Sequence, residues 1–395
     1  MLFPDLLNQE FSRQREGFAE FDREWRSDVD FYVRELGRLD AGQARAARDL
    51  WAAAPDCALP ADEWERGGTF FAPFGVTWPT HEAARRWALT ILSDRVTCAA
   101  DGSQLNPGRE VSLPIALLQV AWFENPHNAA GDYHKGAKPC LISPAELLNP
   151  AEGRVNPDTV ISYRRFELEV GALCEFMERR RGWRGRGERA PLAFLDGSLT
   201  YMLSFGGART EVQESYEQIT LRLLQLSRET EIPVVGYIDQ SYSRDLVKLA
   251  DTLRPSLENS RERYPFDAQL LSSFLKNWGD RTVFCHYRRA GLAEKLHGEG
   301  IGFTYLQTTA EGSPARLEMP AWVYQAGLLN EVIDTVRAEC VVGLGYPYAI
   351  ETADQAAVIT ARDREIFLRA TQEFATQGGL SFRVSRKLAS KTRRR

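Results

Sequence analysis

The chain has 395 residues, of which 44% are hydrophobic and 26% are charged. This composition is typical of a folded globular protein and excludes a fibrous or fully disordered chain. The formal charge of −5 excludes a general attraction to nucleic acid, so any binding of nucleic acid requires a local basic surface.

The apolar segments and the cysteines indicate the cellular compartment in which the protein is expected. No run of about 18 apolar residues is found, and the first residues lack the charged start and apolar block of a signal peptide. The six cysteines lie far apart and form no CxxC pair, which favours reduced thiols over disulfides or zinc ligands. We therefore expect a cytoplasmic protein that does not enter a membrane.

The N-terminal part of the chain is expected to be helical. Apolar residues spaced by three and four predict an amphipathic helix within residues 8–50. A segment rich in proline and glycine predicts a connector over 59–80, and a second helix follows over 81–92. We expect residues 1–90 to form a helical region used for dimerisation or for contact with a partner.

From residue 95 onward, predicted strands alternate with predicted helices, which favours an α/β fold with a mixed sheet. The expected strands are 95–100, 111–123, 191–196, 233–239, 282–287, 303–308 and 315–319. The expected helices are 160–180, 212–229, one beginning near 243, 322–339 and 349–374. A polar loop is expected over 125–138, and the basic segment 379–395, which contains no acid, is expected to be a disordered tail.

An Asp-Gly-Ser sequence ends two of the predicted strands, at Asp101 and at Asp196. Each sequence by itself is typical of a tight turn. If the two strands are neighbours in one sheet, however, both carboxylates project from the same edge. Carboxylate oxygens are suitable ligands for Mg²⁺ or Mn²⁺, so the two aspartates predict a shared cation site.

A third acid is selected by its position on the predicted helix 160–180. The buried stripe of that helix consists of four apolar residues: Phe166, Val170, Leu173 and Met177. Glu169 lies at the edge of this stripe. A buried acid requires a cation or an arginine beside it, and the candidates are a metal ion and Arg165, one turn earlier.

A fourth acid comes from the segment GYPYAIETADQAAVI. Pro347 is typical of a helix start, and Asp354 then lies beside an expected buried face, although it could equally be a solvated acid. Tyr346 either packs against the helix entry or orients a phosphate beside a metal cluster.

Four acids on separate elements are typical of two-metal phosphodiesterases, in which one cation activates water and the other stabilises the leaving oxygen. A carboxylate pair also serves glycoside hydrolases, and spacing does not separate the two readings. A glycosidase groove would need more aromatic side chains near the aspartates than Trp122 and Trp183 supply.

Five motifs in series resemble the ordered motifs of the NurA nuclease family across about residues 95–370: RVTCAADGSQLNPGRE, RRFELE, FLDGSL, ARLEMP and GYPYAIETADQAAVI. The resemblance implies an RNase H-like mixed sheet flanked by helices, in a nuclease domain over 91–378. It also implies DNA hydrolysis that depends on Mn²⁺ or Mg²⁺, with two ions per site. The implied role is end resection in double-strand break repair and homologous recombination, by a homodimer acting with a HerA-type hexameric ATPase.

When the family's motifs are matched to this sequence position by position, the resemblance implies that four acids bind metal: Asp101, Glu169, Asp196 and Asp354. It also implies that Tyr346 is catalytic. Asp354 stands where many members of the family have a histidine, and this difference leaves the preferred cation open. It also allows an alternative function, that of a non-catalytic subunit that binds DNA or regulates the ATPase. Under this reading Arg165, Arg244 and the arginine-rich loop 179–189 are candidate phosphate contacts; the alternative for each is a solvated surface arginine.

Overall fold

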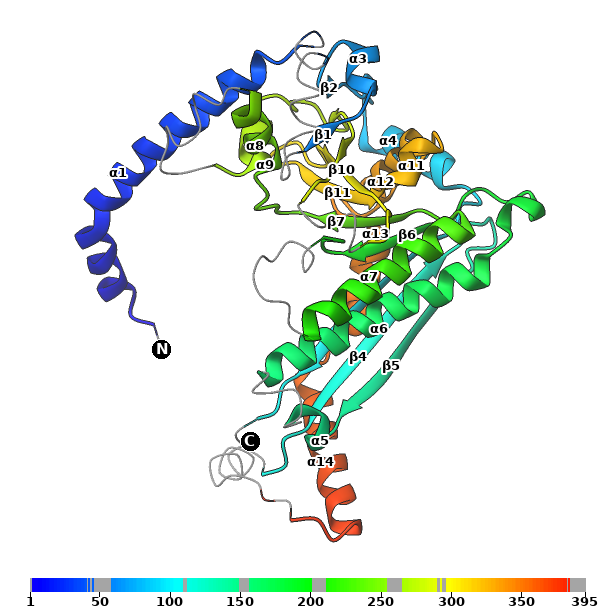
Figure 1. Ribbon diagram of the computed structural model, residues 1–395. Helices are drawn as coiled ribbons and strands as arrows, with labels where there is room; N and C mark the ends of the chain where they lie inside the picture. Colours follow the sequence, from blue (N-terminus) through cyan, green and yellow to red (C-terminus); the bar gives the residue numbers. More distant parts are fainter. Residues whose placement is uncertain are drawn as a thin grey trace. The chain divides into compact units, whose positions relative to one another are not determined.

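The computed structural model describes residues 2–40, 42, 45, 58–108, 112–148, 156–200, 211–253, 265–289, 292, 296–381 and 383 (Figure 1). The chain forms two compact units, each assembled from separate segments. Unit 1 comprises Met1–Val76, Ile238–Ala293 and Gly300–Glu318, and unit 2 comprises Thr77–Tyr237, Glu294–Glu299 and Met319–Arg395. The domain limits 1–90, 91–378 and 379–395 stay a prediction, and most of the basic tail lies outside the described residues.

A five-stranded part of the sheet lies in unit 2. Its strands are β3 (Thr97–Leu105), β4 (Ala116–Asn125), β5 (His134–Ile142), β6 (Leu192–Asp196) and β7 (Val234–Ile238). Their order is β7-β6-β3-β4-β5, with β4 antiparallel to both of its neighbours and β6 parallel to β3 and to β7. This order, with these directions, is that of an RNase H-like sheet, so the predicted fold class is confirmed.

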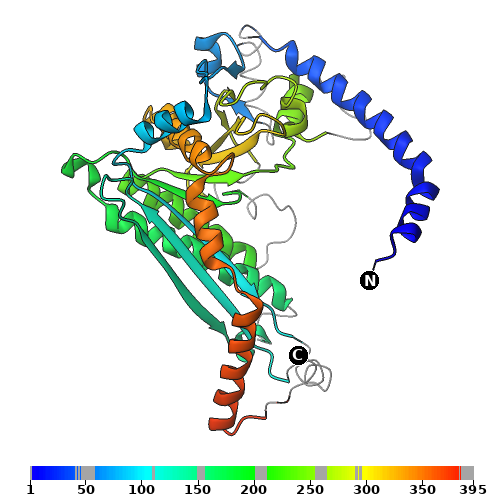
Figure 2. The ribbon, with the colours of Figure 1, turned by 180° about the vertical axis from the view of Figure 1, so that it is seen from behind.

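Helices cover both faces of this sheet. The helices of unit 2 are α4 (His81–Leu92), α5 (Pro144–Leu147), α6 (Pro157–Arg180), the 3-10 helix η2 (Trp183–Arg186), α7 (Glu211–Thr230), α11 (Ala321–Gln325), α12 (Leu329–Val342), α13 (Tyr348–Ala357) and α14 (Ala361–Gln377). Figures 1 and 2 show α6 and α7 on one face and α13 on the other. The predicted helix over 81–92 agrees with α4, whereas the single helices expected over 322–339 and 349–374 are each two helices.

The first Asp-Gly-Ser sequence does not end its strand, contrary to the prediction. β3 continues to Leu105, and Asp101, Gly102 and Ser103 pair with Ala121, Val120 and Gln119 of β4. Pairing with a long neighbour supplies hydrogen bonds that extend the strand beyond its apolar part. The loop expected over 125–138 is also partly wrong, because β5 begins at His134. That strand is mostly exposed and shows no apolar alternation from which it could be predicted.

Unit 1 carries the remaining elements. They are α1 (Pro4–Gly37), β1 (Leu59–Pro60), α3 (Glu63–Gly67), β2 (Phe71–Ala72), α8 (Asp245–Leu253), α9 (Asp267–Leu271), β8 (Arg281–Thr282), β9 (Cys285–His286), β10 (Ile301–Leu306) and β11 (Ala315–Pro320). The connector expected over 59–80 thus contains β1, α3 and β2, and the strand expected over 282–287 is the pair β8 and β9. In the part of the chain that the structure describes, no helix is long and apolar enough to cross a membrane.

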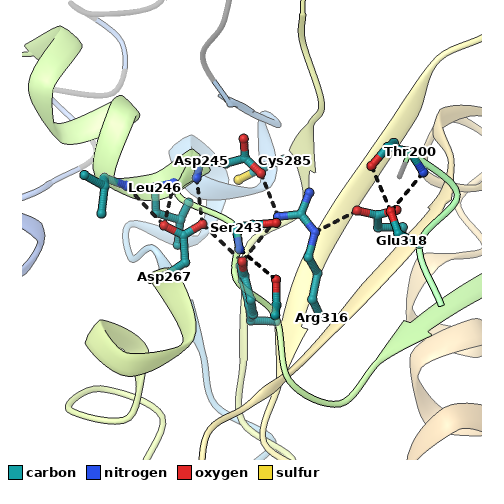
Figure 3. A network of polar contacts seen from close by, with 12 residues as sticks. Thr200, Ser243, Asp245, Leu246, Asp267, Cys285, Arg316 and Glu318 are labelled. Atoms are coloured by element: carbon teal, nitrogen blue, oxygen red, sulfur yellow. Dashed lines mark hydrogen bonds and ion pairs between the residues drawn. The ribbon is translucent and has the colours of Figure 1, made fainter. Parts of the chain in front are cut away.

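A buried polar network stabilises unit 1 (Figure 3). Arg316 of β11 donates to Asp245 and to Glu318, each at 2.8 Å, and its guanidinium lies 3.8 Å above the Phe303 ring. The carboxylate of Asp267 accepts backbone hydrogen bonds from Asp245 and Leu246 and so caps the start of α8. The network therefore connects α8, α9 and β11.

Candidate metal and nuclease site

The two Asp-Gly-Ser aspartates lie on adjacent strands. In the parallel pair of β3 and β6, Ala100 is opposite Leu195, and Asp101 and Asp196 are the next residues of the two strands. The neighbouring position of the strands that the sequence required is therefore confirmed. Asp101 is half-buried within β3, and Asp196 is exposed at the end of β6.

Asp101 interacts with two other carboxyl groups. Burial, a hydrogen bond with Asp354 and the charges of Asp196 and Asp354 raise the pKa of Asp101 to about 6. Like charges raise the pKa of a carboxyl only when they are close. Strands β3 and β6 and helix α13 therefore bring three acids to one place.

Glu169 approaches the same place from α6. This helix begins where the Asn156 side chain accepts the Asp158 amide hydrogen, with Pro157 in its first turn. Glu169 is 7% exposed, as its position beside the apolar stripe predicted. Burial and the charges of Asp101 and Asp196 raise its pKa to about 8, while Arg165 acts in the opposite direction.

Arg165 only partly compensates Glu169. Its Nε lies 3.5 Å from Glu169 Oε1, which is too long for a good hydrogen bond, and its Nη1 donates to the Gly102 carbonyl at 3.2 Å. Glu169 Oε1 is buried and has no hydrogen-bond partner among the described residues. A buried carboxyl in this condition is stabilised either by protonation, as its raised pKa indicates, or by a further positive group.

Gly102 allows this close approach of α6 to β3. A Cβ atom at Gly102 would lie 2.6 Å from Glu169 Oε1 and 2.7 Å from Arg165 Cγ. Such distances are too short for non-bonded heavy atoms, so a larger residue after Asp101 would force the Glu169 carboxylate or the Arg165 side chain to move.

Tyr346 and Asp354 come from the C-terminal motif. The Tyr346 hydroxyl donates to Asp196 Oδ1 at 2.8 Å, and its ring packs edge-on against Tyr237. The face of α13 made by Ile350, Ala353 and Ala357 is buried, as expected. Asp354, on the neighbouring face, is itself exposed and meets Asp101.

A sequence model of the NurA family, described as the NurA domain, matches residues 95–359, which is more than half of the chain. The chain belongs to the NurA family. No curated protein sequence matches it.

Several solved structures resemble this NurA-family chain. The NurA nuclease from Sulfolobus solfataricus is 15% identical, with a TM-score of 0.47, over 72% of this chain and 85% of that one. A structure of NurA with manganese is 10% identical, with a TM-score of 0.36, over 68% and 87%. The catalytic domain of human endonuclease V is 13% identical, with a TM-score of 0.32, over 74% and 96%.

The predicted phosphate contacts of the NurA-family chain have different environments. Arg165 is half-buried beside the acids, whereas Arg244 belongs to unit 1 and lies over the Phe266 ring at 4.7 Å. The segment 179–189, predicted as a loop, contains the end of α6 and the 3-10 helix η2, and its arginines are largely compensated by acids. Five of its arginines pair with Glu124, Glu178, Glu188, Glu229 or Glu231, namely Arg179, Arg180, Arg181, Arg184 and Arg186.

Two residues that support the site were missed in the sequence. Gly102 was considered only as part of a turn signal. Glu339, an acid within the otherwise apolar segment Ala338–Val342, is completely buried in α12. A charged residue inside such a run is the one signal that could have drawn attention to it.

The donor set of this NurA-family chain fits a hard divalent cation. Asp101, Glu169, Asp196 and Asp354 offer only oxygen, and their mutual repulsion together with the unpartnered Glu169 Oε1 would be relieved by a positive ion. Among the described residues, however, no group of three or more His, Cys, Asp and Glu side chains is arranged so that it could hold a metal ion. Metal binding by these four acids would therefore require their side chains to move.

Proposed function

We propose that this NurA-family chain is a divalent-metal-dependent deoxyribonuclease that hydrolyses phosphodiester bonds at Asp101, Glu169, Asp196 and Asp354. The observation that carries the proposal is the convergence of these acids. Burial, and after it the like charges of the neighbouring acids, raise the pKa values of Asp101 and Glu169. A fold that maintains such repulsion without a cation would be destabilised by it.

The four carboxylates would hold Mn²⁺ or Mg²⁺, with two ions per site as the expected number. The bound metal would supply the positive charge that activates water and stabilises the leaving oxygen. Tyr346 orients Asp196 through its hydroxyl, and the half-buried guanidinium of Arg165 is placed to contact a phosphate. Asp354 in place of the histidine of many members makes the site all-oxygen, which favours hard cations over softer ones.

DNA ends are the proposed substrate. We propose that the protein acts in end resection during double-strand break repair, together with a HerA-type hexameric ATPase. Arg165 and Arg244 are the proposed contacts to the DNA backbone. The basic segment 379–395 could add counterion release to this binding.

A homodimer is proposed on the basis of helix α1. Its N-terminal half exposes large apolar side chains, including Leu6, Phe11 and Phe18, each between 55% and 59% exposed. Exposed apolar side chains gathered on one element are typical of an interaction surface, and residues 1–90 are accordingly proposed for dimerisation or partner contact. Sedimentation of the full chain and of the Phe11→Glu/Phe18→Glu variant would test this, because the double change should dissociate the dimer without loss of the fold.

The nuclease proposal is tested with single- and double-stranded DNA in Mn²⁺, with and without chelator. The test compares wild type with Asp354→Asn, and Glu351→Gln on the same helix is the matched control. Glu351 is exposed, and its side chain accepts a hydrogen bond from Gln355 one turn later. We expect chelator to abolish cleavage, Asp354→Asn to lower it at least 100-fold and Glu351→Gln to leave it unchanged. DNA binding without cleavage by wild type would support the non-catalytic alternative, and cleavage of glycosides that resists chelator would support a carbohydrate hydrolase.

A further inference from the structure

Helix α13, which carries Asp354 and directly follows Tyr346, has no N-terminal cap of its own. The residue at its N-cap position is Pro347, whose side chain offers no hydrogen-bond acceptor. The first amide groups of a helix lack partners within the helix and need an acceptor from elsewhere. In most helices a Ser, Thr, Asp or Asn at the N-cap position provides it.

Glu339, in the last turn of α12, provides this acceptor instead. Its Oε2 accepts the Ala349 amide hydrogen at 2.9 Å, and the Tyr348 amide also donates to the carboxylate. A negative group at this end also interacts favourably with the helix dipole. The cap of α13 is therefore a residue nine positions before its first helical residue.

The same carboxylate is tied to strand β3. Glu339 Oε1 accepts the Thr97 hydroxyl hydrogen at 2.8 Å, and Thr97 lies four residues before Asp101 on that strand. His127 Nε2 lies 3.5 Å from the same oxygen. The His127 Nδ1 is 2.7 Å from the Arg95 carbonyl oxygen, so that Nδ1 carries the hydrogen and the orientation of the ring is set.

The turn between α12 and α13 leaves little freedom for compensation. A Cβ atom at Gly343 would lie 2.1 Å from the Tyr346 carbonyl oxygen, and Leu344 and Gly345 have φ values of 58° and 114°. A shift at the start of α13 would therefore be passed to Tyr346 on one side and to Asp354 on the other.

We infer that Glu339 is a positioning residue that connects α13 to β3 and thereby fixes Tyr346 and Asp354 relative to Asp101. This inference rests on the proposed nuclease function, since the positions it explains are those of the proposed ligands. Glu339 itself touches neither substrate nor metal. It acts through the Ala349 and Tyr348 amides and through Thr97.

The test combines the loss of the remote cap with the gain of a local one. The variants are Glu339→Gln, Pro347→Ser and the double variant Glu339→Gln/Pro347→Ser. The matched control is Asp334→Asn on the same helix, where Asp334 is half-buried and pairs with the buried Arg337. Amide hydrogen exchange of the metal-free, DNA-free protein reports on the cap. The kcat and KM of DNA cleavage in Mn²⁺ report on the site.

For Glu339→Gln we expect amide exchange in α13 to accelerate at least ten-fold while exchange in α14 is unchanged. We expect kcat to fall at least ten-fold with KM for DNA within two-fold of wild type. A serine at position 347 accepts from the Ala349 or Ile350 amide, so the double variant should recover exchange protection in α13. Its kcat should stay low, because the serine does not restore the contact with Thr97 of β3. Pro347→Ser alone and Asp334→Asn should resemble wild type.

Three results would overturn the inference. The first is a wild-type kcat in Glu339→Gln. The second is a double variant that recovers kcat together with exchange protection, because the contact of Glu339 with Thr97 would then have no role. The third is a failure to fold of both Glu339→Gln and the double variant, because the defect would then not be the loss of the α13 cap. A wild-type protein that cleaves no DNA in Mn²⁺ would refute the proposed function, and the exchange measurements would still decide whether Glu339 caps α13.

Discussion

Tyr346 donates a hydrogen bond of 2.8 Å to Asp196, across 150 residues of sequence. The bond connects the loop before α13 to the end of β6 and orients one proposed ligand. We expect Tyr346→Phe to retain the packing against Tyr237 and therefore the fold, and to lose the orientation of Asp196. A hydrogen bond to a charged group contributes about 1.5–3 kcal/mol, so kcat should fall by roughly 10- to 100-fold.

Tyr348→Phe is the control for this change, because Tyr348 lies two residues further along and its ring contacts Phe123. Steady-state cleavage of DNA in Mn²⁺ measures both variants. Equal rates for Tyr346→Phe and Tyr348→Phe would show that the hydroxyl of Tyr346 has no part in the reaction.

Gly102→Ala should displace Glu169 and weaken metal binding. The added Cβ would lie 2.6 Å from Glu169 Oε1, so either the carboxylate or strand β3 has to move. We expect Mn²⁺ affinity, measured by calorimetry, to fall at least ten-fold and the free energy of unfolding to fall by about 1–3 kcal/mol.

Gly171→Ala is the matched control, since a Cβ at this position of α6 meets nothing within 4 Å. Alanine in a helix interior is favoured over glycine by about 1 kcal/mol, so this variant should bind Mn²⁺ normally and unfold no more easily than wild type. Unchanged Mn²⁺ affinity in Gly102→Ala would contradict the close packing of Glu169 against β3.

The carboxyl cluster should make the stability of the metal-free protein depend on pH. The pKa values of Asp101 and Glu169 are raised to about 6 and about 8, whereas unfolded Asp and Glu titrate near about 3.9 and 4.3. The folded state then holds protons that the unfolded state has released. The free energy of unfolding of the metal-free protein should consequently fall as the pH rises from about 4 to about 8.

Mn²⁺ should reverse this loss, because it replaces the protons at the carboxylates. Thermal unfolding with Mn²⁺ and with chelator at pH 5 and pH 8 provides the measurement, and the increase in Tm on adding Mn²⁺ should be larger at pH 8. Asp101→Asn should reduce that increase. An equal effect of Mn²⁺ at the two pH values would count against a metal site at these acids.

The buried network of unit 1 should be sensitive to the loss of a single charge. Arg316 and Asp245 are each 1% exposed in their side chains and lie 2.8 Å apart. Asp245→Ala leaves Arg316 buried beside fewer acceptors, and removal of one partner of a buried pair costs about 3–5 kcal/mol. Urea unfolding measures this cost, with Lys248→Ala on the exposed side of α8 as the control. A loss below about 1 kcal/mol for Asp245→Ala would show that the pair is not important for stability.

Much of the site could be predicted because it follows from local patterns. The apolar strands before Asp101 and Asp196 are parallel neighbours, and the 3.6-residue period of α6 is enough to place Glu169 beside the buried stripe. The family motifs, read in order, identified the same residues. The fold class followed from the alternation of strands and helices, since each buries one face against the others.

The sequence by itself therefore determined the type of sheet and the acids that converge on it. Apolar periodicity and the ends of apolar strands depend on residues that are close together in the sequence. Only the tertiary structure decided that β3 runs on through Asp101, since that depends on pairing with β4. It also decided that Glu339 caps α13 and binds Thr97, a residue 242 positions away. Hydrogen bonds and ion pairs between distant segments have no local pattern, so they become visible only once the chain has folded.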